Sequence, residues 1–99
     1  MKIQMQAVHF SADQKLLDFI EKKLNKLDHY FGKITDVNVT LKLENAGQIK
    51  DKIAEIRLGV PGGFVIVRET CKTFETAIDR AIPLLKRQLI KFKEVKSQN

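Results

Sequence analysis

The spacing of apolar residues changes along this chain from every second residue to every third or fourth and back, and this pattern predicts the order of its strands and helices. Residues 2–8 alternate between apolar and polar side chains, which predicts a half-buried strand. Between about residue 12 and Tyr30 the apolar side chains share one stripe, as a core-facing helix requires. Ser11 and Gln14 have the spacing of a capping box at the start of this helix, and Gly32 follows its end.

Alternation returns in the middle of the chain and predicts three more strands. The alternating stretches cover residues 34–43, 54–60 and 64–69, with loop-forming residues at 45–48 and 61–63 between them. A second helix starts at Thr73 or a neighbour, and its apolar side chains share one face.

The resulting order, βαβββα, indicates an α+β fold with a four-stranded mixed sheet and two helices on one face. A strand, a helix and a strand form a right-handed crossover, so the first two strands should be parallel, and short turns should make the other pairings antiparallel. Both helices must bury their apolar stripes against the same sheet face. The other face is open to solvent, and we expect Ile53, Val65 and Val67 to lie on it as a modest apolar patch.

The chain is short enough to form only one domain. With 99 residues, 43% of them apolar, it has room for one core and no deep catalytic cleft. We assign residues 1–95 to this domain and residues 96–99 to a polar tail. The longest apolar run is residues 64–67, far too short to span a membrane, so we expect a cytoplasmic protein without a membrane partner.

Residues that support catalysis or metal binding are scarce. Cys71 is the only cysteine, which excludes an internal disulfide or a cysteine-based metal cage, and we expect it to serve as a small residue near a helix start. His9 and His29 have neither metal-ligand spacing nor an evident nucleophile beside them. Residues 61–63 lack the helix and lysine of a phosphate-binding loop. We therefore expect no enzyme activity, cofactor, metal or small-molecule substrate, and interpret Asp79 as a surface or packing-edge residue.

Positive charge is concentrated near the C-terminus. Residues 80–96 contain six Lys and Arg but one acid, and so carry +5 of the net charge of +6. At about 100° per residue, Arg80, Arg87 and Lys91 lie along one flank of the last helix. Lys86 and Lys93 lie along the other flank, with the apolar face between them.

The first predicted helix is neutral in sum but sorted by sign. Lys15, Lys22 and Lys26 lie on one edge with Lys23 close by, and the acids lie elsewhere. Two helices with basic edges on one sheet face would form a positive surface for a phosphate backbone, although charge alone fits a solvated lysine-rich face equally well. The expected partner interaction is recognition of shape and phosphate, because the helix aromatics are expected to pack inward: Tyr30, Phe31, Phe74 and Phe92.

Two segments resemble a known family. Residues 74–79 and 85–93 are similar to the aromatic-x-x-Ala-Ile-Asp and Leu-x-Arg-Gln-Leu-x-Lys-x-Lys signature of the ribosome hibernation promoting factors and ribosome-associated inhibitors, formerly called sigma-54 modulation proteins. Residues 23–31, with Val37 and 41–44, resemble the first helix and second strand of the same family.

The resemblance implies a fold similar to double-stranded-RNA-binding domains and a non-enzymatic translation inhibitor. Such a protein would bind ribosomal RNA of the small subunit, in the channel for messenger and transfer RNA, during starvation. Five residues match basic positions of the family and are the implied RNA ligands: Lys23, Lys26, Arg87, Lys91 and Lys93. Three more are added from local charge geometry: Lys22, Arg80 and Lys86. The alternative is a protein-interaction module that modulates a transcription (sigma) factor through the open sheet face.

The sequence departs from the family pattern in three respects. Phe74 stands where members usually have tyrosine, and Pro83-Leu84 replaces a pair whose second member is commonly lysine. A proline inside a helix bends it, so we expect a kink at Pro83 that leaves the core contacts intact. The chain resembles the short form of the family, so any pairing of two ribosomes is expected to need a second factor or a contact that the sequence does not reveal.

Overall fold

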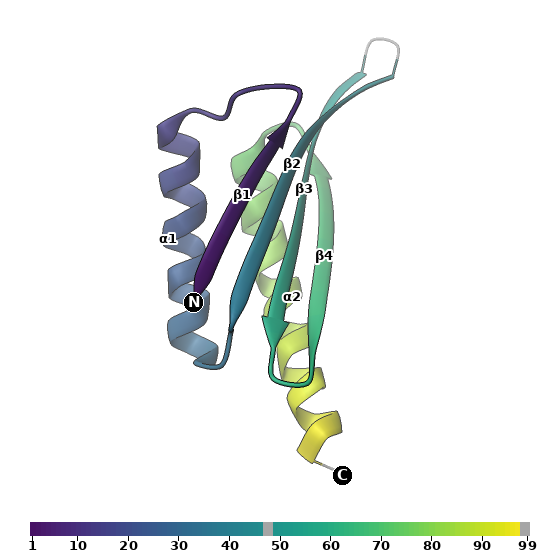
Figure 1. Cartoon of the computed structure of the whole chain (residues 1–99). Coiled ribbons are helices and arrows are strands. Elements are labelled where there is room, and N and C mark those ends of the chain that lie inside the picture. Colours follow the sequence, from purple (N-terminus) through teal and green to yellow (C-terminus); the bar gives the residue numbers. More distant parts are fainter. Residues whose placement is uncertain (47–48, 98–99) are drawn as a thin grey trace.

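The computed structural model describes residues 1–46 and 49–97 and confirms the predicted βαβββα order (Figure 1). The loop predicted at residues 45–48 is shorter than expected, because Asn45 and Ala46 belong to a strand, and residues 47 and 48 lie outside the described residues. The elements are β1 (Lys2–Val8), α1 (Gln14–Phe31), β2 (Asp36–Ala46), β3 (Ile49–Val60), β4 (Gly63–Cys71) and α2 (Phe74–Ser97).

The four strands form one mixed sheet in the order β1-β2-β3-β4. As predicted, β1 and β2 are parallel and the other two pairs are antiparallel. One row of paired residues crosses the whole sheet and faces the helices: Ile3, Val37, Leu58 and Val65. The register therefore places one apolar side chain from every strand in the same layer of the core.

The open-face patch expected at Ile53, Val65 and Val67 is only partly correct. Val65 and Val67 are 6% and 5% exposed and belong to the core cluster, so this expectation is wrong for both. Ile53 is buried, but its paired residues on the neighbouring strands, Lys42 and Thr70, are exposed, which places it on the open face. The open face instead presents the alternating residues of β4, Phe64 and Ile66, which are 51% and 43% exposed.

Both helices cover the same face of the sheet, as predicted. Figure 1 shows α1 and α2 running side by side along it. Each helix contributes three large side chains that are at most 1% exposed and join the inward side chains of the strands in one cluster: Ile20, Leu24 and Leu27 from α1, and Ile78, Leu85 and Leu89 from α2. The core therefore holds the two helices at a defined separation.

The N-terminal cap of α1 is Asp13, two residues later than the predicted Ser11. The Asp13 carboxylate accepts a hydrogen bond from the backbone N–H of Leu16 at 2.8 Å. The Gln14 side chain does not reach back to a cap, because its amide donates to the Asp18 carboxylate one turn further on. The predicted capping box is therefore wrong, although a short oxygen-bearing side chain caps the helix as the principle requires.

Replacing Asp13 by alanine should lower the free energy of unfolding by about 1 kcal/mol, because an unpaired N–H is left at the helix start. Urea denaturation followed by circular dichroism measures the change. Ser11→Ala is the matched control and should leave stability unaltered. A larger loss for Ser11→Ala than for Asp13→Ala would show that the cap lies at Ser11.

The other predicted helix ends are confirmed. Gly32 adopts a left-handed conformation (φ 77°) after α1, and its N–H donates to the carbonyl of Asp28. This conformation costs glycine little because it lacks a Cβ. Thr73 precedes α2, and its hydroxyl accepts a hydrogen bond from the N–H of Thr76 at 3.1 Å.

Helix α2 continues through Pro83 and reaches further than predicted. Leu85 and Leu89, which follow Pro83 by two and six residues, are both 0% exposed, so the core contacts next to the proline are intact. The bend at Pro83 stays a prediction. Residues 96 and 97 of the predicted tail belong to α2, and residues 98 and 99 lie outside the described residues. Over the described chain, neither helix has an apolar stretch long enough to cross a membrane.

Candidate nucleic-acid interface

Lysines from both helices meet in a hollow between α1 and α2. The hollow has a volume of about 190 Å³ and combines cationic walls with an apolar floor. We call it the interhelical groove and define it by Lys23, Lys26, Leu27, Asp79, Ile82, Pro83 and Lys86. Three of the eight predicted RNA-binding residues are therefore brought together by the fold, from opposite halves of the chain.

The burial pattern of the two helices explains why these lysines meet. Lys23 and Lys26 each precede a buried leucine of α1 by one residue, whereas Lys86 follows buried Leu85 of α2. A step of one residue turns a helical position by about 100°, so each lysine lies on the flank of its helix beside the apolar stripe. Because the two helices lie side by side on one sheet face, these flanks face each other.

One carboxylate partly neutralises the groove. Lys23 Nζ lies 3.2 Å from Asp79 Oδ1, and the two side chains are 40% and 54% exposed. The same ammonium lies 5.3 Å from the centre of the Phe19 ring. The expectation that Asp79 is a surface or packing-edge residue agrees with this position. Lys23 is thus held by a carboxylate and an aromatic ring, while the three lysines and one aspartate leave the groove with a net charge of +2.

Tyr30 lies beside the groove and is exposed, contrary to the expectation that it packs inward. The residue is 59% exposed, and Lys86 Nζ lies 4.9 Å from the centre of its ring. The spacing contains a signal for this position, because Tyr30 follows Lys26 by four residues and Lys23 by seven, which places all three on one helix flank.

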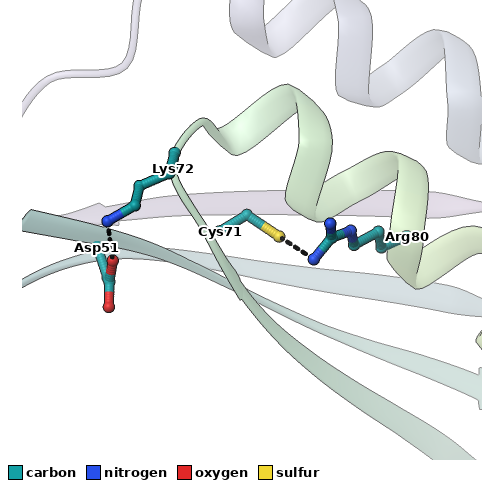
Figure 2. A network of polar contacts seen from close by, with 4 residues as sticks. All are labelled: Asp51, Cys71, Lys72 and Arg80. Carbon is teal, nitrogen blue, oxygen red and sulfur yellow. Dashed lines mark hydrogen bonds and ion pairs between the residues drawn. The ribbon is translucent and has the colours of Figure 1, made fainter.

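Arg80 points away from the groove, toward β4. Its guanidinium donates to the Cys71 sulfur at 3.6 Å, as Figure 2 shows. In the same view Lys72 reaches Asp51 at 3.4 Å. Cys71 is 8% exposed and ends β4 shortly before α2, which matches its expected role as a small residue near a helix start.

Three more predicted residues also lie outside the groove. Arg87 and Lys91 are exposed and follow Arg80 by seven and eleven residues, so they share its flank of α2. Lys22 lies on the outer side of α1, in a shallow hollow with two acids and an asparagine: Asp18, Glu21 and Asn25. The acids beside Lys22 make it a weaker candidate for binding phosphate.

Lys93 lines a separate hollow at the far end of α2. This space, of about 690 Å³, is mainly apolar. Phe92 of α2 also lines it, and the remaining lining residues come from the end of α1, the segment that follows it and the start of the β3–β4 turn: Phe31, Lys33, Ile34, Thr35, Val60 and Pro61. The eight predicted residues therefore occupy four regions, of which the interhelical groove is the one where both helices contribute.

No group of three or more His, Cys, Asp or Glu side chains within residues 1–46 and 49–97 could hold a metal ion.

The sequence model of the family described as "Sigma 54 modulation protein / S30EA ribosomal protein" matches residues 3–97. The chain belongs to this family. The resemblance seen in the two helices is therefore confirmed over almost the whole chain.

Curated relatives in the sigma 54 modulation and S30EA family carry related names. A Pseudomonas putida protein called ribosome hibernation promoting factor is 34% identical, over 95% of this chain and 88% of its own. The Escherichia coli protein of the same name is 30% identical over the full length of both chains. A ribosome hibernation promotion factor from Deinococcus radiodurans is 34% identical over 91% of this chain, which spans 48% of that longer protein.

Solved structures of related proteins confirm the fold. The N-terminal domain of Protein Y from Thermus thermophilus superimposes with a TM-score of 0.78 at 34% identity, covering 93% of this chain and 99% of that one. A ribosomal subunit interface protein from Coxiella burnetii gives a TM-score of 0.84 over 95% and 99% of the two chains. At 21% identity, the second likeness concerns the fold alone.

Proposed function

We propose that this protein binds ribosomal RNA of the small subunit, in the channel for messenger and transfer RNA, and keeps ribosomes inactive during starvation without catalysing a reaction. The observation that carries the proposal is the interhelical groove, in which Lys23, Lys26 and Lys86 converge with one carboxylate among them. The names of the relatives from Pseudomonas putida and Escherichia coli support ribosome hibernation as the process.

The physical basis is the exchange of counterions for lysine side chains. Phosphates of folded RNA carry condensed cations, and these are released when protein cations replace them. Lys26 and Lys86 offer ammonium groups from two walls of one groove, so a phosphate backbone can lie between them. The exposed Arg87 and Lys91 extend the positive surface along α2. Occupancy of the channel is then sufficient for inhibition, because messenger and transfer RNA need the same space.

Co-sedimentation with purified small subunits over a series of salt concentrations tests this proposal. The logarithm of the binding constant should fall linearly with the logarithm of the salt concentration. The slope should be roughly 0.7 to 0.9 for each neutralised phosphate. Subunits loaded beforehand with messenger and transfer RNA should bind less protein. The proposal is wrong if the protein stays in the supernatant at low salt, and the channel location is wrong if loaded subunits bind equally well.

Replacing Asp79 by asparagine should strengthen binding to small subunits several-fold, because the groove gains one positive charge and Lys23 loses its partner carboxylate. The free energy of unfolding should change by less than about 1 kcal/mol, since the two side chains of the pair are 40% and 54% exposed. Co-sedimentation at fixed salt measures the affinity. Asp28→Asn, on the same helix pair but outside the groove, is the control for a general change in charge, and an equal gain for both variants would contradict a local effect.

A second candidate function is protein binding through the open sheet face, as in modulation of a sigma factor. The exposed side chains of Phe64 and Ile66 favour it. Two double variants distinguish the two candidate functions. Reversing the charges of Arg87 and Lys91 should strongly weaken ribosome binding if RNA is the partner. Replacing Phe64 and Ile66 by serine should abolish protein binding and leave ribosome binding intact.

A further inference from the structure

We propose that Tyr30 is a base-stacking site at the edge of the interhelical groove, where an unpaired RNA base lies on the tyrosine ring while adjacent phosphates contact Lys26 and Lys86. The inference rests on the proposed function and adds to it a contact with a base. Tyr30 carries no charge, so electrostatic attraction of phosphate gives it no part in binding. Stacking on an unpaired base would give it one.

The exposure of Tyr30 is the first observation. At 59%, it is more exposed than any other large hydrophobic side chain in the described part of the chain. Its neighbour Phe31 packs against the core, so the end of α1 buries one aromatic ring and leaves the next one in solvent. An exposed aromatic surface between cationic side chains is the arrangement with which single-stranded nucleic acid is commonly bound.

The second observation is the position of Lys86. Its ammonium lies 4.9 Å from the centre of the Tyr30 ring, within the range of a cation–π interaction. This contact places the ammonium over one face of the ring, while 59% of the residue stays exposed to solvent and available to a base. Lys86 also lines the interhelical groove, so one side chain links the ring to the phosphate-binding surface.

A comparison with the other exposed aromatic residue supports this choice. Phe64 is 51% exposed, and the Arg57 guanidinium lies 4.3 Å from its ring centre. However, Phe64 is paired with Gly59, where an added Cβ would come within 3.0 Å of the Asp36 carboxylate. The Asp36 carboxylate therefore lies against Gly59, the residue that pairs with Phe64, on the side of the sheet opposite the helices. The surroundings of Phe64 thus combine one cation with one carboxylate, whereas Tyr30 lies beside a groove with a net charge of +2.

Intrinsic fluorescence provides a direct test, because Tyr30 is the only tyrosine and the chain contains no tryptophan. The probes are a single-stranded RNA of twelve nucleotides and an abasic ribose-phosphate chain of the same length. Both carry the same charge and should bind, but stacking requires a base. We expect strong quenching of the tyrosine emission by the RNA and little by the abasic chain. Equal quenching by both probes, or none by either, would overturn the inference.

Variants at the same position give a second readout. Tyr30→Phe keeps the ring and should retain RNA affinity within about twofold. Tyr30→Leu should lose about tenfold in affinity for the RNA and none for the abasic chain, as expected when a base–aromatic stack is removed. Phe64→Leu is the matched control and should bind both probes like the unmodified protein. Unchanged RNA affinity for Tyr30→Leu would contradict stacking.

The two proposals fail in different ways. If Tyr30→Leu binds small subunits as well as the unmodified protein does, the stacking inference is wrong and the proposed function stands. If the unmodified protein does not bind small subunits but the single-stranded RNA still quenches the Tyr30 fluorescence, the stacking site is supported and the ribosomal target is wrong.

Discussion

Replacing both Lys26 and Lys86 by glutamate is expected to reduce the affinity for small ribosomal subunits by about a hundredfold or more. The two substitutions change the net charge of the interhelical groove from positive to negative, because Lys23 and Asp79 already neutralise each other. Each lysine that contacts a phosphate also contributes about one unit to the salt slope, so the slope should fall by about 2. Co-sedimentation across a salt series measures both quantities in one experiment.

A matched variant separates a local effect from a general loss of positive charge. Lys2 and Lys42 are exposed, and their register places them on the open face of the sheet. Replacing both by glutamate changes the net charge equally. This control should slow association at low salt and leave the salt slope almost unchanged. An equal loss of affinity and slope in the two double variants would contradict a binding site in the groove.

The order of strands and helices could be predicted because each element repeats its apolar residues at its own period. The β1 residues alternate, and the α1 residues share one stripe, so each element indicates which side is buried. Periodicity did not predict the buried face of β4, because residues 64–67 are all apolar and do not alternate with polar residues. Only pairing with β3 decides the face there, since Leu58 opposite Val65 is buried.

The candidate site was predictable in part, for a related reason. A helical wheel places Lys86 on one flank of α2 and Arg80, Arg87 and Lys91 on the other. It does not say which flank faces α1, because that depends on how the helices sit on the sheet. The structure answers this with two contacts, since Lys86 meets Tyr30 of α1 while Arg80 meets Cys71 of β4.

Contacts between residues distant in sequence could not be predicted from the spacing of residues along the chain. The ion pair between Lys23 and Asp79 joins two helices, and neither residue predicts the other by spacing. Its presence changes the role of Lys23, which matches a basic position of the family and yet is partly neutralised within this chain. Lys26 and Lys86 line the same groove and are therefore the stronger candidates for direct phosphate contact.

Replacing Leu85 by alanine is expected to lower the free energy of unfolding by about 2–5 kcal/mol, the range for large-to-small substitutions in a protein core. Leu85 is 0% exposed and belongs to the cluster that joins both helices to the sheet. Its removal loses apolar burial and leaves a cavity that the surrounding elements fill only partly. Since small domains have a total stability of about 5–15 kcal/mol, the loss should appear as a clear shift in urea denaturation.

The effect of Leu85→Ala on binding should differ from that of the lysine variants. Lys86 is the next residue in α2, so the core contact of Leu85 determines where the neighbouring ammonium lies relative to α1. Under conditions where the variant is folded, the salt slope should persist because every cation is still present, whereas the affinity falls. Ile90→Ala is the control on the same helix: Ile90 is 43% exposed, and its loss should cost less than about 1 kcal/mol. Equal destabilisation by the two variants would contradict the assignment of Leu85 to the core, and a reduced salt slope for Leu85→Ala would show that the groove itself had been lost.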